Sequence, residues 1–131
     1  MPKNNPTRKT RERRPSACID FDGVLAEYHG WRGADYWGKP MPGVKLFLQR
    51  LVRANVSIIV YTTRTDKKAI TAWFKKYKLP RPDAITHVKI PATIYIDDRA
   101  IQFDGDWTTF AKKLQRFTVY WKEQYQPFKN I

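Results

Sequence analysis

Residues 56–61 place the strongest constraint on how this chain can fold. They read Val56-Ser57-Ile58-Ile59-Val60-Tyr61, a run dominated by β-branched residues. A strand of this composition has no face suited to water, so we expect it to be buried on both faces, as strands of parallel sheets are. The run therefore predicts a parallel β-sheet.

Strand-like and helix-like segments alternate on either side of this run. Apolar segments that suit further strands lie at residues 16–21, 84–88 and 93–96, and a short edge strand is expected at 100–103. Apolar residues recur at helical spacing over residues 43–54, 66–77 and 107–126. Thr65 and Asp66 are alternative N-caps for the second of these helices. The alternation predicts an α/β fold, a doubly wound, Rossmann-like parallel sheet with right-handed crossovers and helices on both faces.

The chain divides into a basic arm and one domain. Residues 1–15 carry many Lys and Arg side chains, three prolines and almost nothing apolar. Such a segment cannot bury enough surface to order itself, so we expect a disordered arm. It either only solubilises the protein or contacts nucleic-acid phosphates, and the sequence leaves both open. Residues 16–131 are long enough for a single α/β domain but not for two.

The composition limits the partners and the compartment. The 25 Lys and Arg residues against 12 Asp and Glu give a formal net charge of +13, which favours polyanions or other acidic partners. Cys18 is the single cysteine, which excludes an internal disulfide and indicates a reducing compartment. No apolar run is long enough to span a bilayer, so no membrane partner is expected. We expect a soluble, cytoplasmic protein, with a monomer favoured.

Polar residues stand at the carboxyl end of each predicted strand. Asp20 and Asp22 are two residues apart, so both side chains can point to one face, and Gly23 allows a sharp turn after them. The corresponding groups after the later strands are Thr62, Thr63 and Arg64, then Lys89, then Asp97 and Asp98. Ligands of doubly wound sheets bind at this edge, where the strand order reverses, so these residues are expected to form one site.

The carboxylates at this edge suit a divalent cation. Mg²⁺ prefers oxygen ligands and is usually held by one or two carboxylates together with water and substrate phosphate. The candidate metal ligands are Asp20, Asp22, Asp97 and Asp98. A hydrogen bond from the scaffold to Asp98 is an alternative that stays open.

This set of residues suits phosphoryl transfer. The Asp20 carboxylate can attack phosphorus to form an aspartyl-phosphate, and Mg²⁺ would offset the repulsion between the two anions. Lys89 would add positive charge near the phosphate, and Asp22 would act as general acid and base. Candidate phosphate-binding groups are Thr62, Thr63, Gly23 and Arg64.

Some of these roles have alternatives. Thr62 and Thr63 could instead cap the next helix, and Lys89 could be a solvated surface residue. For Arg64 and Arg99, pairing with the acids of the site is favoured over binding phosphate. A zinc site is not expected, because the two histidines have no partners at zinc-site spacing.

Residues 26–42, between the first strand and the first helix, are rich in Gly, Trp and Tyr and predict a loop or flap. Aromatic residues such as Trp31 and Trp37 could stack on a nucleobase, but packing of the flap onto the domain is the favoured interpretation.

In order and spacing, the residues above resemble the motifs of the haloacid dehalogenase-like (HAD) superfamily of phosphohydrolases. The first motif is matched by Asp20-Phe21-Asp22-Gly23-Val24, the second by Thr62, the third by Lys89 and the fourth by Asp97-Asp98. The resemblance covers residues 16–107. It implies that Asp20 is the nucleophile and Asp22 the acid/base, with Thr62 and Lys89 on the phosphate side and Asp97 with Asp98 on the metal side.

The chain also resembles small HAD members, often met in phage genomes, that lack a large cap domain. A site without a cap would be open enough to admit a macromolecule. We therefore expect a Mg²⁺-dependent phosphatase that hydrolyses phosphomonoesters through an aspartyl-phosphate, with a lean toward nucleotides or nucleic-acid ends. The alternative is a nucleic-acid-binding or scaffold protein that keeps the fold with little or no turnover.

Overall fold

The computed structural model describes residues 14–131. Its strands are β1 (Ser16–Asp20), β2 (Ser57–Tyr61), β3 (Ala84–Thr86) and β4 (Ile94–Ile96), and its helices are α2 (Val44–Arg53), α3 (Lys67–Lys76) and α4 (Phe110–Gln115). Residues 1–13 of the predicted arm lie outside the described part. Arg14 and Pro15 belong to the domain instead, since Arg14 donates to the Asn55 carbonyl and the Pro15 carbonyl accepts from Ser57 N–H.

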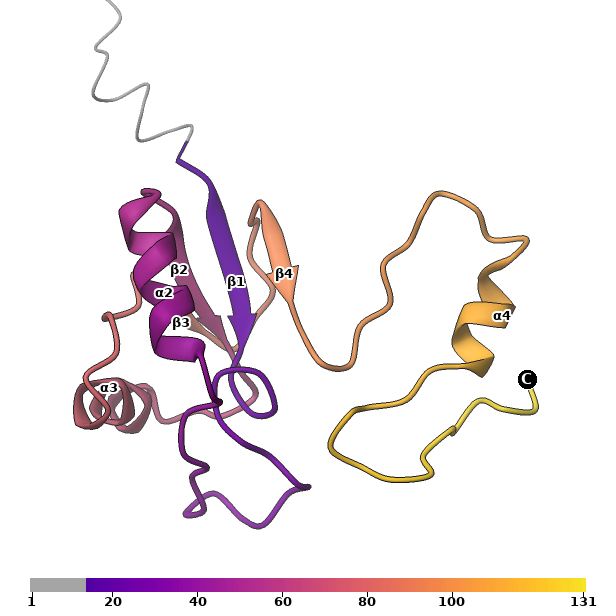
Figure 1. Cartoon of the computed structure of the whole chain (residues 1–131), viewed down its shortest axis with the longest axis horizontal. Helices are drawn as coiled ribbons and strands as arrows, with labels where there is room; N and C mark the ends of the chain where they lie inside the picture. The colour runs from indigo at the N-terminus through magenta and orange to yellow at the C-terminus, as the bar shows by residue number, and fades with distance from the viewer. Residues whose placement is uncertain (1–13) are drawn as a thin grey trace, which may run out of the picture.

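The four strands form one parallel sheet in the order β3-β2-β1-β4. In its central pairings, Cys18 of β1 lies beside Ile59 of β2 and Tyr95 of β4. The chain first moves outward from β1 through β2 to β3, then returns across the sheet to place β4 on the other side of β1 (Figure 1). This reversal confirms the predicted Rossmann-like, doubly wound sheet and puts the switch point between β1 and β4.

The main hydrophobic core lies on one face of the sheet. Alternate residues of the central strands, among them Ile19 and Val60, pack in one cluster with Leu48 of α2 and with Ile70 and Phe74 of α3. The two longer helices therefore cover the same face. As predicted, β2 is buried on both faces, because Ile58, Ile59 and Val60 are all buried.

The opposite face has less helical cover than a doubly wound sheet predicts. Cys18, Tyr61 and Tyr95 line a cavity of about 780 Å³ on that side. The connection from β3 to β4 contains no helix, and α4 stands apart from the sheet and buries no residue (Figure 1). This face is therefore open to ligands or solvent over part of its area.

The first two predicted helices are confirmed to within one residue. Of the two candidate caps for α3, Asp66 is the one used: its carboxylate accepts from Ala69 N–H at 2.9 Å, which satisfies one of the free donors at the helix start. The sequence pattern was sufficient here because apolar spacing and cap residue agree.

The loop predicted for residues 26–42 is present, and its ends are fastened together. Glu27 N–H donates to the Lys39 carbonyl, and the Gly38 carbonyl accepts from the Trp73 indole at 2.8 Å. Gly38 is required by this closure, because a Cβ there would lie 2.0 Å from the Glu27 carbonyl oxygen. Trp37 packs on Phe21, as expected for a flap that packs onto the domain. Trp31 is 60% exposed and does not follow that expectation.

The predicted C-terminal helix is much shorter than expected. Helix α4 ends at Gln115, and residues 117–121 form an irregular segment in which Val119 is buried. This segment is rich in β-branched and aromatic residues, which have low helix propensity. The edge strand expected at 100–103 is also absent, since these residues form no bridge with β4. None of the helices in residues 14–131 is long and apolar enough to cross a bilayer.

Candidate metal centre and phosphate site

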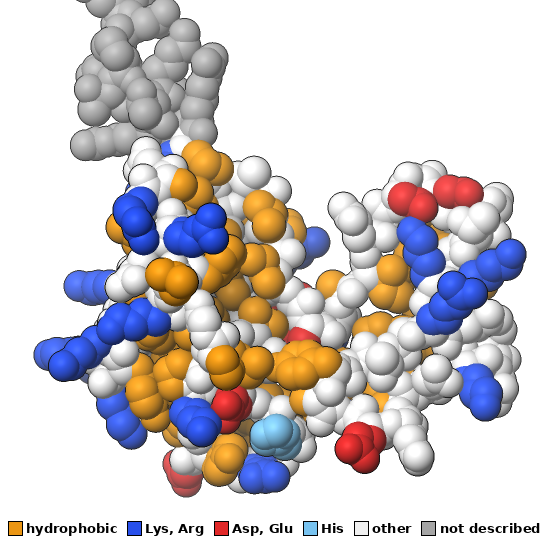
Figure 2. All heavy atoms as spheres, in the orientation of Figure 1, with side chains coloured by type: hydrophobic (Ala, Val, Ile, Leu, Met, Phe, Trp, Pro, Cys, Tyr) orange, Lys and Arg blue, Asp and Glu red, His pale blue; other side chains and the backbone are white. Residues whose placement is uncertain are grey.

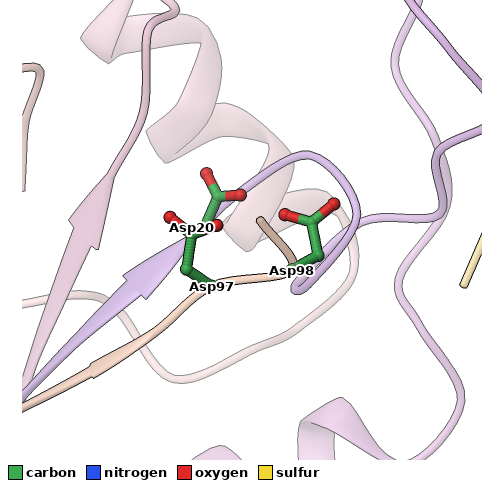
Figure 3. A group of neighbouring side chains, drawn as sticks. All are labelled: Asp20, Asp97 and Asp98. Atoms are coloured by element: carbon green, nitrogen blue, oxygen red, sulfur yellow. The ribbon is translucent and has the colours of Figure 1, made fainter. Parts of the chain in front are cut away.

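Three carboxylates meet where the strand order reverses. Asp20 ends β1, and Asp97 and Asp98 directly follow β4. Because β1 and β4 are neighbours, the three side chains lie together beyond the strand ends (Figure 3), and each offers one oxygen within 4.8 Å of the others. The predicted convergence of the first and fourth motifs is therefore observed.

Asp98 is held in place by a residue from the far end of the chain. Its Oδ2 accepts a hydrogen bond of 2.6 Å from the indole Nε1 of Trp121. Its Oδ1 is buried and has no hydrogen-bond partner within the described residues. A buried carboxylate oxygen without a donor is unfavourable. Trp121 thus fixes one oxygen of Asp98 and leaves the other free for a further ligand.

The three carboxylates lie close enough to oppose one another's ionisation. Burial is the largest cause, and the adjacent carboxyl groups of Asp98 and Asp97 add to it; together they raise the pKa of Asp20 to about 8 from an ordinary 3.8. The hydrogen bond from Phe21 N–H to Asp20 acts in the opposite direction. A divalent cation would supply the missing positive charge, and the all-oxygen donor set is the one that Mg²⁺ prefers. The residues therefore fit the ion.

Gly23 is needed because a side chain at this position would collide with the Asp98 carboxylate. Its φ of 91° is in the left-handed region, and a Cβ there would lie 2.5 Å from Asp98 Oδ2. Its N–H already donates to the Ala26 carbonyl, and its own carbonyl accepts from the Tyr120 hydroxyl. The predicted phosphate-binding role is thus not supported, since its backbone donor is already in use.

Asp22 is not part of the carboxylate cluster, which corrects its prediction as a metal ligand. Both of its oxygens accept from Arg64, at 2.8 Å from Nε and 3.0 Å from Nη2. Arg64 also donates to the carbonyls of Ala34 and Tyr36 in the flap, and its guanidinium lies 4.1 Å from the centre of the Trp37 ring.

Arg64 is therefore a structural link between Asp22 and the flap. It is buried, and all three of its nitrogens are engaged by Asp22 and by the flap. These bonds use four of the five guanidinium N–H donors and leave one on Nη1. The interpretation favoured from the sequence, pairing with an acid of the site, is the one observed.

Thr62 and Thr63 follow β2 and line a cavity of about 440 Å³ together with Asp20, Asp22 and Asp97. Thr62 is buried, its N–H donates to the Thr86 carbonyl, and its hydroxyl oxygen accepts from Arg64 N–H at 3.1 Å. The Thr62 hydroxyl retains its own proton for donation. Thr63 is exposed, so both threonines remain candidates for holding a phosphate.

Lys89 lies in the adjoining cavity on the open sheet face, whose wall also includes Asp20 and Asp97. Its ammonium is 4.7 Å from the centre of the Tyr95 ring, and no ion pair joins it to a carboxylate within residues 14–131. The structure thus places Lys89 on the same side as the cluster without bonding it to Asp20.

Tyr120 and Trp121 were missed as site residues by the sequence analysis. Trp121 lies on the apolar stripe of the predicted C-terminal helix, a position that favours packing in the core. The indole N–H of Trp121 is the available signal, because such a group needs a hydrogen-bond partner where it is shielded from water. Tyr120 is 62% exposed and gives no such signal. Their partners, Asp98 and the Gly23 carbonyl, are distant in the sequence, so no local sequence pattern predicts these hydrogen bonds.

Comparisons with known proteins add information on the fold. No protein-family model and no curated protein sequence matches this chain. A solved structure, described as that of the conserved protein coded by locus from Bacteroides thetaiotaomicron, is similar with a TM-score of 0.56 and 20% sequence identity. The match covers 76% of this chain and 92% of that one. At this level of identity the similarity establishes a shared α/β fold.

Proposed function

We propose that this protein is a Mg²⁺-dependent phosphatase of the HAD type, which hydrolyses phosphomonoesters through an aspartyl-phosphate on Asp20. The observation that carries the proposal is the meeting of Asp20, Asp97 and Asp98 at the switch point, with one buried oxygen of Asp98 unpartnered. Ligands of doubly wound sheets bind at that point.

The cluster would hold the ion through Asp20, Asp97 and Asp98. Mg²⁺ bound there would supply the positive charge that keeps Asp20 ionised and offsets its repulsion of the phosphate. The cavity lined by Asp20, Thr62 and Thr63 would hold the phosphate itself.

In the proposed first step, a carboxylate oxygen of Asp20 forms a bond to phosphorus as the bond from phosphorus to the leaving-group oxygen breaks. The Thr62 hydroxyl donates to a phosphoryl oxygen, and Lys89 contributes positive charge from the adjoining cavity. In the second step, water attacks the phosphorus, the Asp20 carboxylate leaves, and inorganic phosphate is released.

Proton transfer is assigned to Asp22, in two parts. With both oxygens bonded to Arg64, the carboxylate is a proton acceptor, which suits removal of a proton from the attacking water. Delivery of a proton to the leaving group requires Arg64 to release one of these oxygens. Because Arg64 also binds the flap carbonyls of Ala34 and Tyr36, movement of the flap would accompany that change.

The lean toward nucleotides or nucleic-acid ends is part of the proposal. Basic side chains are spread over the face seen in Figure 2, and the sequence carries a formal charge of +13. A positive surface raises the local concentration of anionic substrates.

The test is phosphate release from an aryl phosphate, nucleotides and end-phosphorylated oligonucleotides, with Mg²⁺ or with a chelator. We expect release to need the metal and to fall by roughly a thousandfold or more in Asp20→Asn, as expected for loss of a nucleophile. Asp97→Asn should lose activity in parallel with metal binding. Asp104→Asn is the matched control, because Asp104 is an exposed aspartate bonded to Lys113 and lies outside the cluster.

Activity that survives in Asp20→Asn would exclude the proposed nucleophile. A folded protein that binds Mg²⁺ but releases phosphate from no substrate would favour the alternative function, a binding or scaffold protein with this fold. Salt-dependent binding of oligonucleotides would then be the next measurement.

A further inference from the structure

A further cavity, lined by aromatic side chains, adjoins the cavity of about 440 Å³ that contains Asp20, Thr62 and Thr63. It has a volume of about 460 Å³, and its aromatic walls are Tyr28, Trp31, Phe117, Trp121 and Tyr125. Two of these residues, Tyr28 and Trp31, also line the cavity that contains the carboxylates, as does Arg99. The two cavities are thus neighbours with common walls. We call the one lined by aromatic side chains the aromatic cavity.

The aromatic walls of the cavity come from two distant parts of the chain. The flap provides Tyr28 and Trp31, and the residues after α4 provide Phe117, Trp121 and Tyr125, while Arg99 enters from the segment after β4. Tyr28 and Trp121 pack edge to face with ring centres 4.8 Å apart, which joins the two segments. Trp31 is 60% exposed, so its ring is accessible to a ligand.

The charged groups of the aromatic cavity are all basic. Arg99 lies over the Trp121 ring at 5.1 Å, and Lys122 lies over the Tyr125 ring at 4.3 Å. Among residues 14–131, no acidic side chain lines this cavity. Aromatic faces combined with cations suit a flat, electron-rich ring that is attached to an anion.

We propose that the aromatic cavity binds the base of a nucleotide whose phosphate lies at the carboxylate cluster. This inference rests on the proposed phosphatase function and names its substrate class. The sugar of a nucleotide separates the base from the phosphate, which suits two cavities that adjoin but remain distinct. In phosphotyrosine the ring is attached directly to the phosphate, with no sugar between them. With its phosphate at the carboxylate cluster, the ring would lie beside the cluster and would not reach the aromatic cavity.

The test compares substrates that carry the same phosphate with and without a base. Free nucleotides are represented by uridine 5′-monophosphate against ribose 5-phosphate, and nucleic-acid ends by phosphorylated oligonucleotides with and without a terminal base. We expect kcat/KM to favour the substrate with the base by about tenfold or more, in line with stacking on aromatic side chains. The arm with the larger preference identifies the source of the nucleotide.

The decisive variant is Tyr125→Ala, because Tyr125 lines the aromatic cavity and not the cavity of the carboxylates. It should lower the preference for the base roughly fivefold or more and change kcat/KM for ribose 5-phosphate by less than about twofold. Trp107→Ala is the matched control: Trp107 is a 72% exposed aromatic residue outside the cavity, and its loss should leave the preference unchanged.

The outcomes separate this inference from the proposed function. Phosphate release with no preference for a base, or a better rate on a phosphotyrosine peptide, would overturn the inference while the phosphatase stands. An equal loss on both substrates in Tyr125→Ala would assign that residue a structural role and also overturn it. If no substrate is turned over, the affinities for uridine 5′-monophosphate and for ribose 5-phosphate, measured by tryptophan fluorescence, still decide whether the base is bound: equal affinities would overturn the inference.

Discussion

At the scale of single residues, the site depends on how three carboxylates share a small volume. Asp20 is the most affected, because it is half-buried and faces both Asp97 and Asp98. Its ionisation is therefore coupled to folding and to the presence of a cation.

This coupling predicts how stability depends on pH in the absence of divalent cations. The pKa of Asp20 is raised to about 8 in the folded protein from 3.8, so its contribution to stability is complete at pH values below about 4 and is lost as the pH rises toward 8 and beyond. In a chelator, we expect the Tm of wild type to fall relative to that of Asp20→Asn between pH 5 and pH 9. Added Mg²⁺ should reduce this fall. Parallel pH profiles for the two proteins would contradict the assignment.

At the scale of elements, the turn after β1 depends on a glycine for two reasons. Gly23 and Gly30 both have positive φ, but only Gly23 has a neighbour, Asp98, in the space that a Cβ would occupy. The two positions therefore separate the effect of backbone strain from the effect of crowding.

We expect Gly30→Ala to lower the free energy of unfolding by about 1–2 kcal/mol through backbone strain alone. Gly23→Ala adds the displacement of Asp98 and should lower it by about 1–3 kcal/mol more. Gly23→Ala should also weaken Mg²⁺ binding, whereas Gly30→Ala should not. Denaturant unfolding and calorimetric titration of Mg²⁺ provide the measurements, and equal effects of the two substitutions would contradict this account.

Elements with a strong local pattern were predictable, and contacts between distant elements were not. The β-branched run of β2 and the cap of α3 by Asp66 are encoded within a few residues, and both were confirmed. Asp20 and Asp97 could be placed together because parallel strands end at one edge. The sequence predicted that Arg64 pairs with an acid of the site but did not identify Asp22 as that acid. The bonds from Arg64 to the flap carbonyls have no sequence signal, because any backbone carbonyl can accept them.

The C-terminal segment shows the same limit more clearly. An apolar stripe at helical spacing was present, but Val119 is buried and the two following aromatic residues hydrogen-bond near the site instead of extending α4. Tertiary contacts outweighed a weak helical preference. The helix was therefore predicted too long, and its end was missed as part of the site.

At the scale of the whole molecule, the site is completed by the last part of the chain. We predict that Trp121→Phe, which keeps the ring but removes the donor to Asp98, weakens Mg²⁺ binding about tenfold, as loss of a group that orients a metal ligand does. Trp107→Phe is the control, since Trp107 contacts Phe103 and Phe110 and not the carboxylates. Calorimetric titration decides the result, and unchanged affinity in Trp121→Phe would show that Asp98 needs no such support.

The pairing of β1 with β4 also has a consequence for the order in which the protein assembles. The first carboxylate is made early in synthesis, but its partners and the indole that orients one of them come from the final third of the chain. Contacts between distant segments form late, because the entropy of closing a long loop is lost before they are gained. A nascent chain would therefore carry Asp20 without the ability to bind the ion until Asp97, Asp98 and Trp121 have been made and have folded against it.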